Sequence, residues 1–195
     1  MGQVFLDITM SLDGFVAGPN VGVANPLGEG GKRLHDWLFL GAADASGVDR
    51  RVAEELFTGT GAFVMGRRMF DVGIGEWGDD GAFGVPVFVL THRAGAPVVK
   101  GPTTFHFVTG GIANAVGLAA EAAGEGTVGL VGGAEADRQA LAAGLVDELR
   151  VHVATFLLGA GTRLFEGGGW GHVELERTRV VESPFATHLR YRVVR

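Results

Sequence analysis

The sequence has no cysteine, few basic residues and no long apolar run, and each absence narrows what the protein can be. Without cysteine, disulfides, thiolate catalysis and cysteine-based zinc sites are excluded. No stretch of about 20 apolar residues is present that could span a bilayer. The first residues lack the basic segment and apolar core of a secretion signal, so we expect a cytoplasmic protein.

The basic residues are few, and nearly all of them are arginine. The formal net charge of -6 argues against nucleic acid or an anionic membrane as a partner. Lys32 and Lys100 are the only lysines. Genomic bias can explain this preference, but the planar guanidinium group is also well suited to recognising phosphate. The six histidines lack the spacing of a metal site, and no G-x-S-x-G hydrolase motif occurs.

Glycine and apolar residues are abundant, and their order indicates the fold class. The 195 residues, 47% of them hydrophobic, suit a single domain over 1–195 with its own core. Strand-like and helical segments alternate before two final strands joined by a short turn. This order predicts an α/β fold of three layers, with a mostly parallel central sheet, helices on both faces and a C-terminal antiparallel hairpin. We expect strands at 4–10, 15–17, 62–65, 85–91, 103–109, 127–131, 149–158, 172–182 and 187–194, and helices at 32–40, 48–57, 66–71, 112–123 and 134–143.

Two strand-to-helix turns are candidates for binding phosphate. In the first, a buried strand ends at Gly66, and Arg67 and Arg68 follow; in the second, a strand runs into Gly132 and Gly133. Backbone N–H groups at the start of a helix, and its dipole, favour an anion there. The alternatives are arginines paired with nearby carboxylates and an ordinary tight turn.

Other constellations give weaker signals. Thr91, His92 and Arg93 end an apolar strand and could offer a hydroxyl and a guanidinium to a phosphate. Asp13 and Asp36 flank the glycine-rich segment 18–31 and could donate or relay a proton, although either could simply form a turn or lie on a helix surface. The G-x-G-x-x-G sequence at 73–78 follows a helical segment instead of a strand, so we reject it as a dinucleotide fingerprint.

Several motifs, taken in order, resemble the dihydrofolate reductase superfamily. The closer resemblance is to the RibD C-terminal domain, the reductase part of the bifunctional deaminase-reductases of riboflavin biosynthesis. The likeness extends from about residue 3 to residue 194, without the deaminase part. The segments that carry it are Ser11–Gly14, Val64–Arg68, Leu130–Ala134, Gly144–Leu149, Leu157–Gly161, Arg163–Phe165 and Thr187–Tyr191.

The resemblance implies that the protein binds NADPH. Met69 stands where this family often has threonine, which removes a hydroxyl from the phosphate end. Carried over by motif, the residues expected to bind the cofactor are Gly66, Arg67, Arg68 and Met69 at its phosphates, Thr91, His92 and Arg93 at the adenosine end, Gly132, Gly133, Ala134 and Glu135 around the pyrophosphate, and Val16 and Ala17 beside the nicotinamide.

The resemblance also implies a reaction and an assembly. The reaction would transfer hydride from NADPH to a C=N or C=O carbon of a small, heterocyclic substrate, either like 5-amino-6-(5-phosphoribosylamino)uracil or like dihydrofolate. A homodimer formed through the C-terminal strands is expected. The alternative is a nucleotide-binding module without turnover that acts as a sensor or partner protein.

Overall fold

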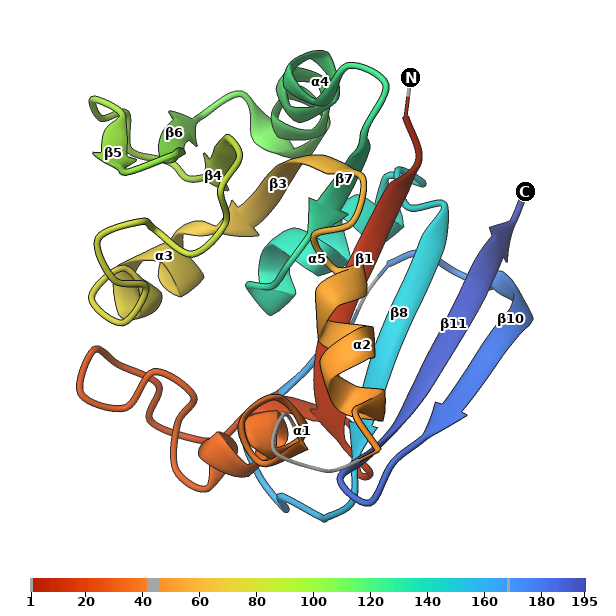
Figure 1. Ribbon diagram of the computed structural model, residues 1–195. Helices are drawn as coiled ribbons and strands as arrows, with labels where there is room; N and C mark the ends of the chain where they lie inside the picture. Colours follow the sequence, from red (N-terminus) through yellow and green to blue (C-terminus); the bar gives the residue numbers. More distant parts are fainter. Residues whose placement is uncertain (1, 42–45, 168) are drawn as a thin grey trace.

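The computed structural model describes residues 2–41, 46–167 and 169–195, and a twisted nine-stranded sheet runs through it (Figure 1). The strand order is β10-β11-β8-β1-β7-β3-β4-β6-β5, and the five pairs from β8 to β6 are parallel. Its strands are β1 (Val4–Ser11), β3 (Thr60–Gly66), β4 (Val87–Leu90), β5 (Val98–Lys100), β6 (Thr103–Val108), β7 (Thr127–Leu130), β8 (Glu148–Ala154), β10 (Glu174–Glu182) and β11 (Ala186–Val194).

The remaining elements cover the two faces of this sheet and one end of it. The short strands β2 (Phe15–Ala17) and β9 (Thr162–Arg163) form a separate two-stranded sheet. The helices are η1 (Gly31–His35, a 3-10 helix), α1 (Asp36–Phe39), α2 (Val48–Glu55), α3 (Arg67–Gly73), α4 (Gly111–Ala123) and α5 (Ala134–Ala142).

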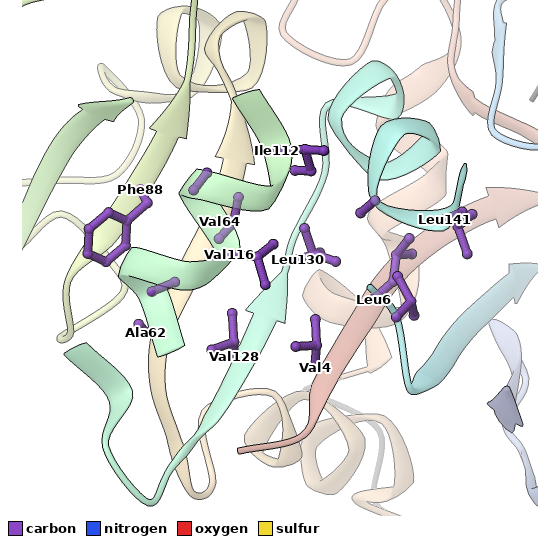
Figure 2. Packing of buried hydrophobic residues seen from close by; sticks show 14 of the residues in the cluster. Val4, Leu6, Ala62, Val64, Phe88, Ile112, Val116, Val128, Leu130 and Leu141 are labelled. Atoms are coloured by element: carbon purple, nitrogen blue, oxygen red, sulfur yellow. The ribbon is translucent and has the colours of Figure 1, made fainter. Parts of the chain in front are cut away.

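Side-chain alternation along the central strands divides the core between the two faces. Val4 and Leu6 of β1 pack with α4 and α5, as Figure 2 shows, whereas Phe5 between them packs on the other face with Phe70 of α3. A third cluster joins α1 and α2 to the C-terminal hairpin. Because successive strand residues point to opposite faces, the consecutive apolar residues Val4, Phe5 and Leu6 of β1 require cover on both sides.

The predicted architecture is confirmed: the sheet is mostly parallel, helices lie on both faces and an antiparallel hairpin closes one edge. Several boundaries differ. The strand expected at 149–158 ends at Ala154, because the N–H groups of Leu158 and Gly159 donate to the Asp13 carboxylate instead of a neighbouring strand. The strand expected at 85–91 starts only after Pro86, and the short strands β5 and β9 were not expected.

The C-terminal hairpin leaves β10 as an edge strand whose residues are almost all exposed. The homodimer expected through this region stays a prediction. In the part of the chain that the structure describes, no helix is long and apolar enough to cross a membrane.

Candidate functional site

A cleft of about 1220 Å³ opens at the carboxyl ends of β1, β3, β4 and β7. In open parallel sheets this is the edge where ligands bind. The volume slightly exceeds that of a typical small-molecule pocket, roughly 300–1,000 Å³, so a dinucleotide and a second small molecule can share it. Every residue expected to bind the cofactor lines this one cleft: Val16, Ala17, Gly66, Arg67, Arg68, Met69, Thr91, His92, Arg93, Gly132, Gly133, Ala134 and Glu135.

The two glycine turns touch each other at the floor of the cleft. The Gly66 N–H donates to the Gly132 carbonyl at 3.0 Å. Gly133 has a φ of +86°, and a Cβ there would lie 2.8 Å from the Cα of Gly66. Gly132, with a φ of +119°, would place a Cβ 2.9 Å from the sulfur of Met69. Both positions therefore need glycine for their backbone angle, and Gly133 needs it also for the close approach of the two chains.

Two helices begin at these turns without a side-chain cap from the described residues. Gly66 precedes α3, and Gly133 precedes α5. The first N–H groups of a helix have no partner within it, and here they open towards the cleft. The nine-residue helix α5 adds the positive end of its dipole.

Four arginines line the cleft. They are Arg67, Arg68, Arg93 and Arg138, and the acidic side chains Asp36, Glu76 and Glu135 line it with them. The Nε of Arg67 lies 2.7 Å from Asp71, a carboxylate pairing of the kind left open as an alternative by the sequence, and its guanidinium lies 5.2 Å from the centre of the Phe107 ring.

Arg68 and Arg138 hold neighbouring chain segments. Arg68 donates to the Val21 carbonyl at 3.1 Å and so ties the glycine-rich loop to α3. Arg138 donates to the carbonyl of Arg163 at 2.7 Å and to Glu135.

These features fit a dinucleotide phosphate. The cradle is made of glycine backbone that a Cβ would fill, and uncapped N–H groups and guanidinium groups surround it. Such groups are the usual ligands of phosphate oxygens in proteins. The β2–β9 edge, where Ala17 pairs with Thr162, borders the other side of the cleft.

The two candidate proton donors have different surroundings. Asp36 lines the cleft, with 35% of its side chain exposed. Asp13 is not among the lining residues. Its carboxylate accepts hydrogen bonds from the Ser11 hydroxyl and from the N–H groups of Leu158 and Gly159, which together lower its pKa to about 2. An ionised carboxylate used in this way holds a loop and is a poor proton donor.

Sequence reasoning missed several lining residues. Arg138 and Gln139 lie on α5 one turn after the glycines, Thr162 follows the Gly159–Gly161 loop, and Lys32 and His35 lie on η1. The helical period after Gly133 could have identified Arg138 and Gln139. Nothing local marks Thr162, because its place depends on pairing with β2.

A buried chain of hydrogen-bonded side chains lies beneath the cleft. His152 and His188, a cross-strand pair on β8 and β11, are 2.8 Å apart at their Nδ1 atoms. The Nε2 of His152 lies 3.1 Å from Asp7, and that of His188 lies 2.7 Å from Asp49. Trp37 packs against both imidazoles and donates to Thr9, which lines the cleft.

The geometry fixes the proton content of this carboxylate–imidazole chain. Its three contacts, Asp7–His152, His152–His188 and His188–Asp49, need one proton each to be hydrogen bonds. With three protons the four groups carry one net negative charge, wherever each proton sits. Burial lowers the pKa of His188, and His152 lowers it further, while Asp49 acts in the opposite direction.

A second buried acid, Asp137, lies in the first turn of α5. It is fully buried, and neither carboxyl oxygen has a hydrogen-bond partner of good geometry among the described residues. Burial raises the pKa of Asp137 to about 7, against the opposing effects of the Gly132 N–H and the Arg138 charge. The carboxyl is therefore neutral in acid and becomes a buried charge above neutral pH.

We expect Asp137→Asn to remove a loss of stability at high pH. The folded-state pKa lies above the unfolded one, so the unfolded chain binds fewer protons and stability falls as pH rises from about 4 to about 7. Relative to the variant, the wild-type protein should lose roughly 2–3 kcal/mol between pH 5 and pH 8. Urea unfolding of both proteins at a series of pH values measures this. Parallel stability profiles would contradict it.

Comparisons with known proteins agree with one another. A family model described as the RibD C-terminal domain matches residues 3–186, and no curated protein sequence matches the chain. A solved putative riboflavin biosynthesis protein from Shewanella sp. PV-4 is 23% identical, with a TM-score of 0.73 over 100% of both chains. The riboflavin biosynthesis reductase Rib7 of Saccharomyces cerevisiae is 14% identical, with a TM-score of 0.60 over 100% of this chain and 89% of that one. A dihydrofolate reductase from Enterococcus faecalis, complexed with NADP(H), is 15% identical, with a TM-score of 0.57 over 98% of this chain and 96% of that one.

Proposed function

The chain belongs to the RibD C-terminal domain family, and from this we propose that it is a reductase that uses NADPH. The likeness to the solved reductases shows the dihydrofolate reductase-like fold expected from the sequence. The proposed reaction reduces a C=N or C=O bond of a small cyclic substrate. Rib7, one relative in fold, is named as a riboflavin biosynthesis reductase, which supports a reductive role.

One observation carries the proposal: the Gly66 and Gly132–Gly133 turns meet in a single cleft that four arginines line. The first N–H groups of α5 and the guanidinium of Arg138 would hold the pyrophosphate. Arg67, which lies against Phe107 of β6 and pairs with Asp71, would recognise the adenosine 2′-phosphate. When bound, the dinucleotide would supply a hydride to the substrate.

The chain's own residues would orient the reactants at the other end of the cleft. The backbone of Val16 and Ala17, fixed by pairing of β2 with β9, would support the nicotinamide. Of the carboxyl groups that line the cleft, Asp36 is the one on the N-terminal segment, away from α3 and α5, and it would pass the proton to the substrate. Water at the open side of the cleft would replenish that proton.

Arg67→Ala should weaken the binding of NADPH much more than the binding of NADH. Loss of a charge-assisted contact costs about 1.5–3 kcal/mol, which corresponds to roughly 10- to 100-fold in Kd for NADPH, whereas NADH lacks the phosphate concerned. Calorimetric titration of both dinucleotides against wild type and variant measures the difference. Arg177→Ala is the matched control, because Arg177 is exposed on the edge strand β10 and does not line the cleft. Equal losses for the two dinucleotides would show that Arg67 does not read the phosphate.

The proposed function itself is tested by cofactor binding and turnover. We expect NADPH to bind at micromolar concentrations and its absorbance at 340 nm to fall when a suitable carbonyl or imine is added. No uptake of NADPH or NADH at high ligand excess would overturn the proposal. Uptake without oxidation across a broad substrate panel would favour a nucleotide-binding module.

A further inference from the structure

The two sides of the cleft differ in charge. Four arginines and two glutamates line the side formed by α3, α5 and the end of β4, and Arg68 reaches across to the Val21 carbonyl. The opposite side is formed by the segment 18–40 together with Ile8 and Thr9 of β1, which we call the N-terminal wall. Among the described lining residues, this wall contributes one cation, Lys32, and one anion, Asp36.

The remaining polar groups of the wall add no charge that could hold an anion. Burial, with the nearby charge of His152, lowers the pKa of His35 to about 4, so this lining imidazole is neutral at pH 7. Arg33 lies over the Phe156 ring, pairs with Asp36 at 3.8 Å and is not among the lining residues. Thr9 accepts a hydrogen bond from Trp37.

Apolar side chains make up most of the wall, and some of them face solvent. Seven of its lining residues are apolar: Ile8, Val21, Val23, Ala24, Pro26, Leu27 and Phe39. Val23 is 75% exposed and Phe39 is 73% exposed, although both line a cleft. Phe39 lies edge-on to the His35 ring, with 6.3 Å between the ring centres. Apolar surface of this kind inside a cleft is the usual lining of a site for an apolar ligand.

Resting on the proposed function, we propose that the substrate is an uncharged, mainly apolar ring compound with a reducible carbonyl or imine, and that it carries no phosphate. The ring would lie against Phe39 and Val23, and its polar edge would face Asp36 and His35. For a carbonyl, one hydride from NADPH adds to the carbon and one proton from water adds to the oxygen, giving an alcohol and NADP⁺.

The test uses two aldehydes that differ by one charge, 2-naphthaldehyde and 6-formyl-2-naphthoate. Their binding to the protein is titrated calorimetrically with NADP⁺ present and with it absent, and their reduction by NADPH is followed at 340 nm. We expect the neutral aldehyde to bind at least about tenfold more tightly than the carboxylate, since an unpaired charge is costly to desolvate. Equal or tighter binding of the carboxylate would overturn the inference.

A single substitution should reverse this preference. Phe39→Arg, at an exposed position where folding is not at risk, should shift the binding ratio at least about tenfold towards the carboxylate. Val99→Arg is the matched control: Val99 is 66% exposed on β5, at the far edge of the sheet, and does not line the cleft. An unchanged ratio in Phe39→Arg would place the substrate elsewhere.

The cofactor proposal and the substrate inference can fail separately. If neither NADPH nor NADP⁺ binds but the neutral aldehyde is still preferred, the proposed function fails, whereas the preference of the N-terminal wall for an uncharged ligand is supported. If NADPH binds and the charged aldehyde is preferred, the inference fails alone.

Discussion

Replacing Gly133 with alanine is expected to abolish dinucleotide binding and to destabilise the fold by about 2–5 kcal/mol. A Cβ at this φ of +86° strains the backbone by about 1–2 kcal/mol. The same atom would lie 2.8 Å and 2.9 Å from the Cα and N of Gly66, so two backbones must separate, at a cost of about 1–3 kcal/mol. Urea unfolding and calorimetric titration with NADPH measure the two effects.

Gly159→Ala separates the cost of the backbone angle from the cost of the contact. Gly159 has a φ of +84°, and a Cβ there would meet nothing within 4 Å. Its N–H still donates to Asp13 in the variant. This control should lose only about 1–2 kcal/mol and keep its affinity for NADPH. Equal losses of stability in the two variants would show that the contact with Gly66 is unimportant.

Asp49→Ala should cost about 3–5 kcal/mol, because it breaks one end of the buried carboxylate–imidazole chain. Asp49 is 1% exposed, and its carboxylate is the partner of the His188 Nε2 at 2.7 Å. Without it, a polar ring atom is left buried and unpaired beneath the wall of the cleft. The shift in the midpoint of urea unfolding measures the loss, provided that the slope of the unfolding free energy against urea concentration is unchanged.

Glu54→Ala on the same helix is the control for Asp49. Glu54 is exposed, and we expect its removal to change stability by less than about 0.5 kcal/mol. A loss in Asp49→Ala as small as that of Glu54→Ala would mean that the buried chain contributes nothing to the fold.

The fold and the glycine- and arginine-lined side of the cleft were predictable because their signals are local. A strand followed by Gly66 and two arginines, or by Gly132 and Gly133, predicts a turn and a helix from neighbours in the sequence alone. The parallel order of the strands then brings such turns to one edge of the sheet. The alternation of strands and helices is also a local signal, and it predicted the three layers of the fold.

Features that depend on register could not be predicted. His152 and His188 were both placed in expected strands, but only the antiparallel pairing of β8 with β11 sets them opposite each other. Asp7 and Asp49 lie 145 and 139 residues from their imidazole partners. Asp13 shows the converse: its position beside a turn was expected, while its bonds to Leu158 and Gly159 come from a distant loop.

The buried carboxylate–imidazole chain has a consequence for how the core holds charge. Moving a proton between neighbouring members relocates the negative charge from the β1 end towards the α2 end, with no exchange with solvent. The position of this negative charge in the core can thus change while the net charge of the protein stays the same. Nuclear magnetic resonance of the imidazole nitrogens should reveal such tautomers at a single pH. An acid–base titration would not detect them, because the number of bound protons does not change.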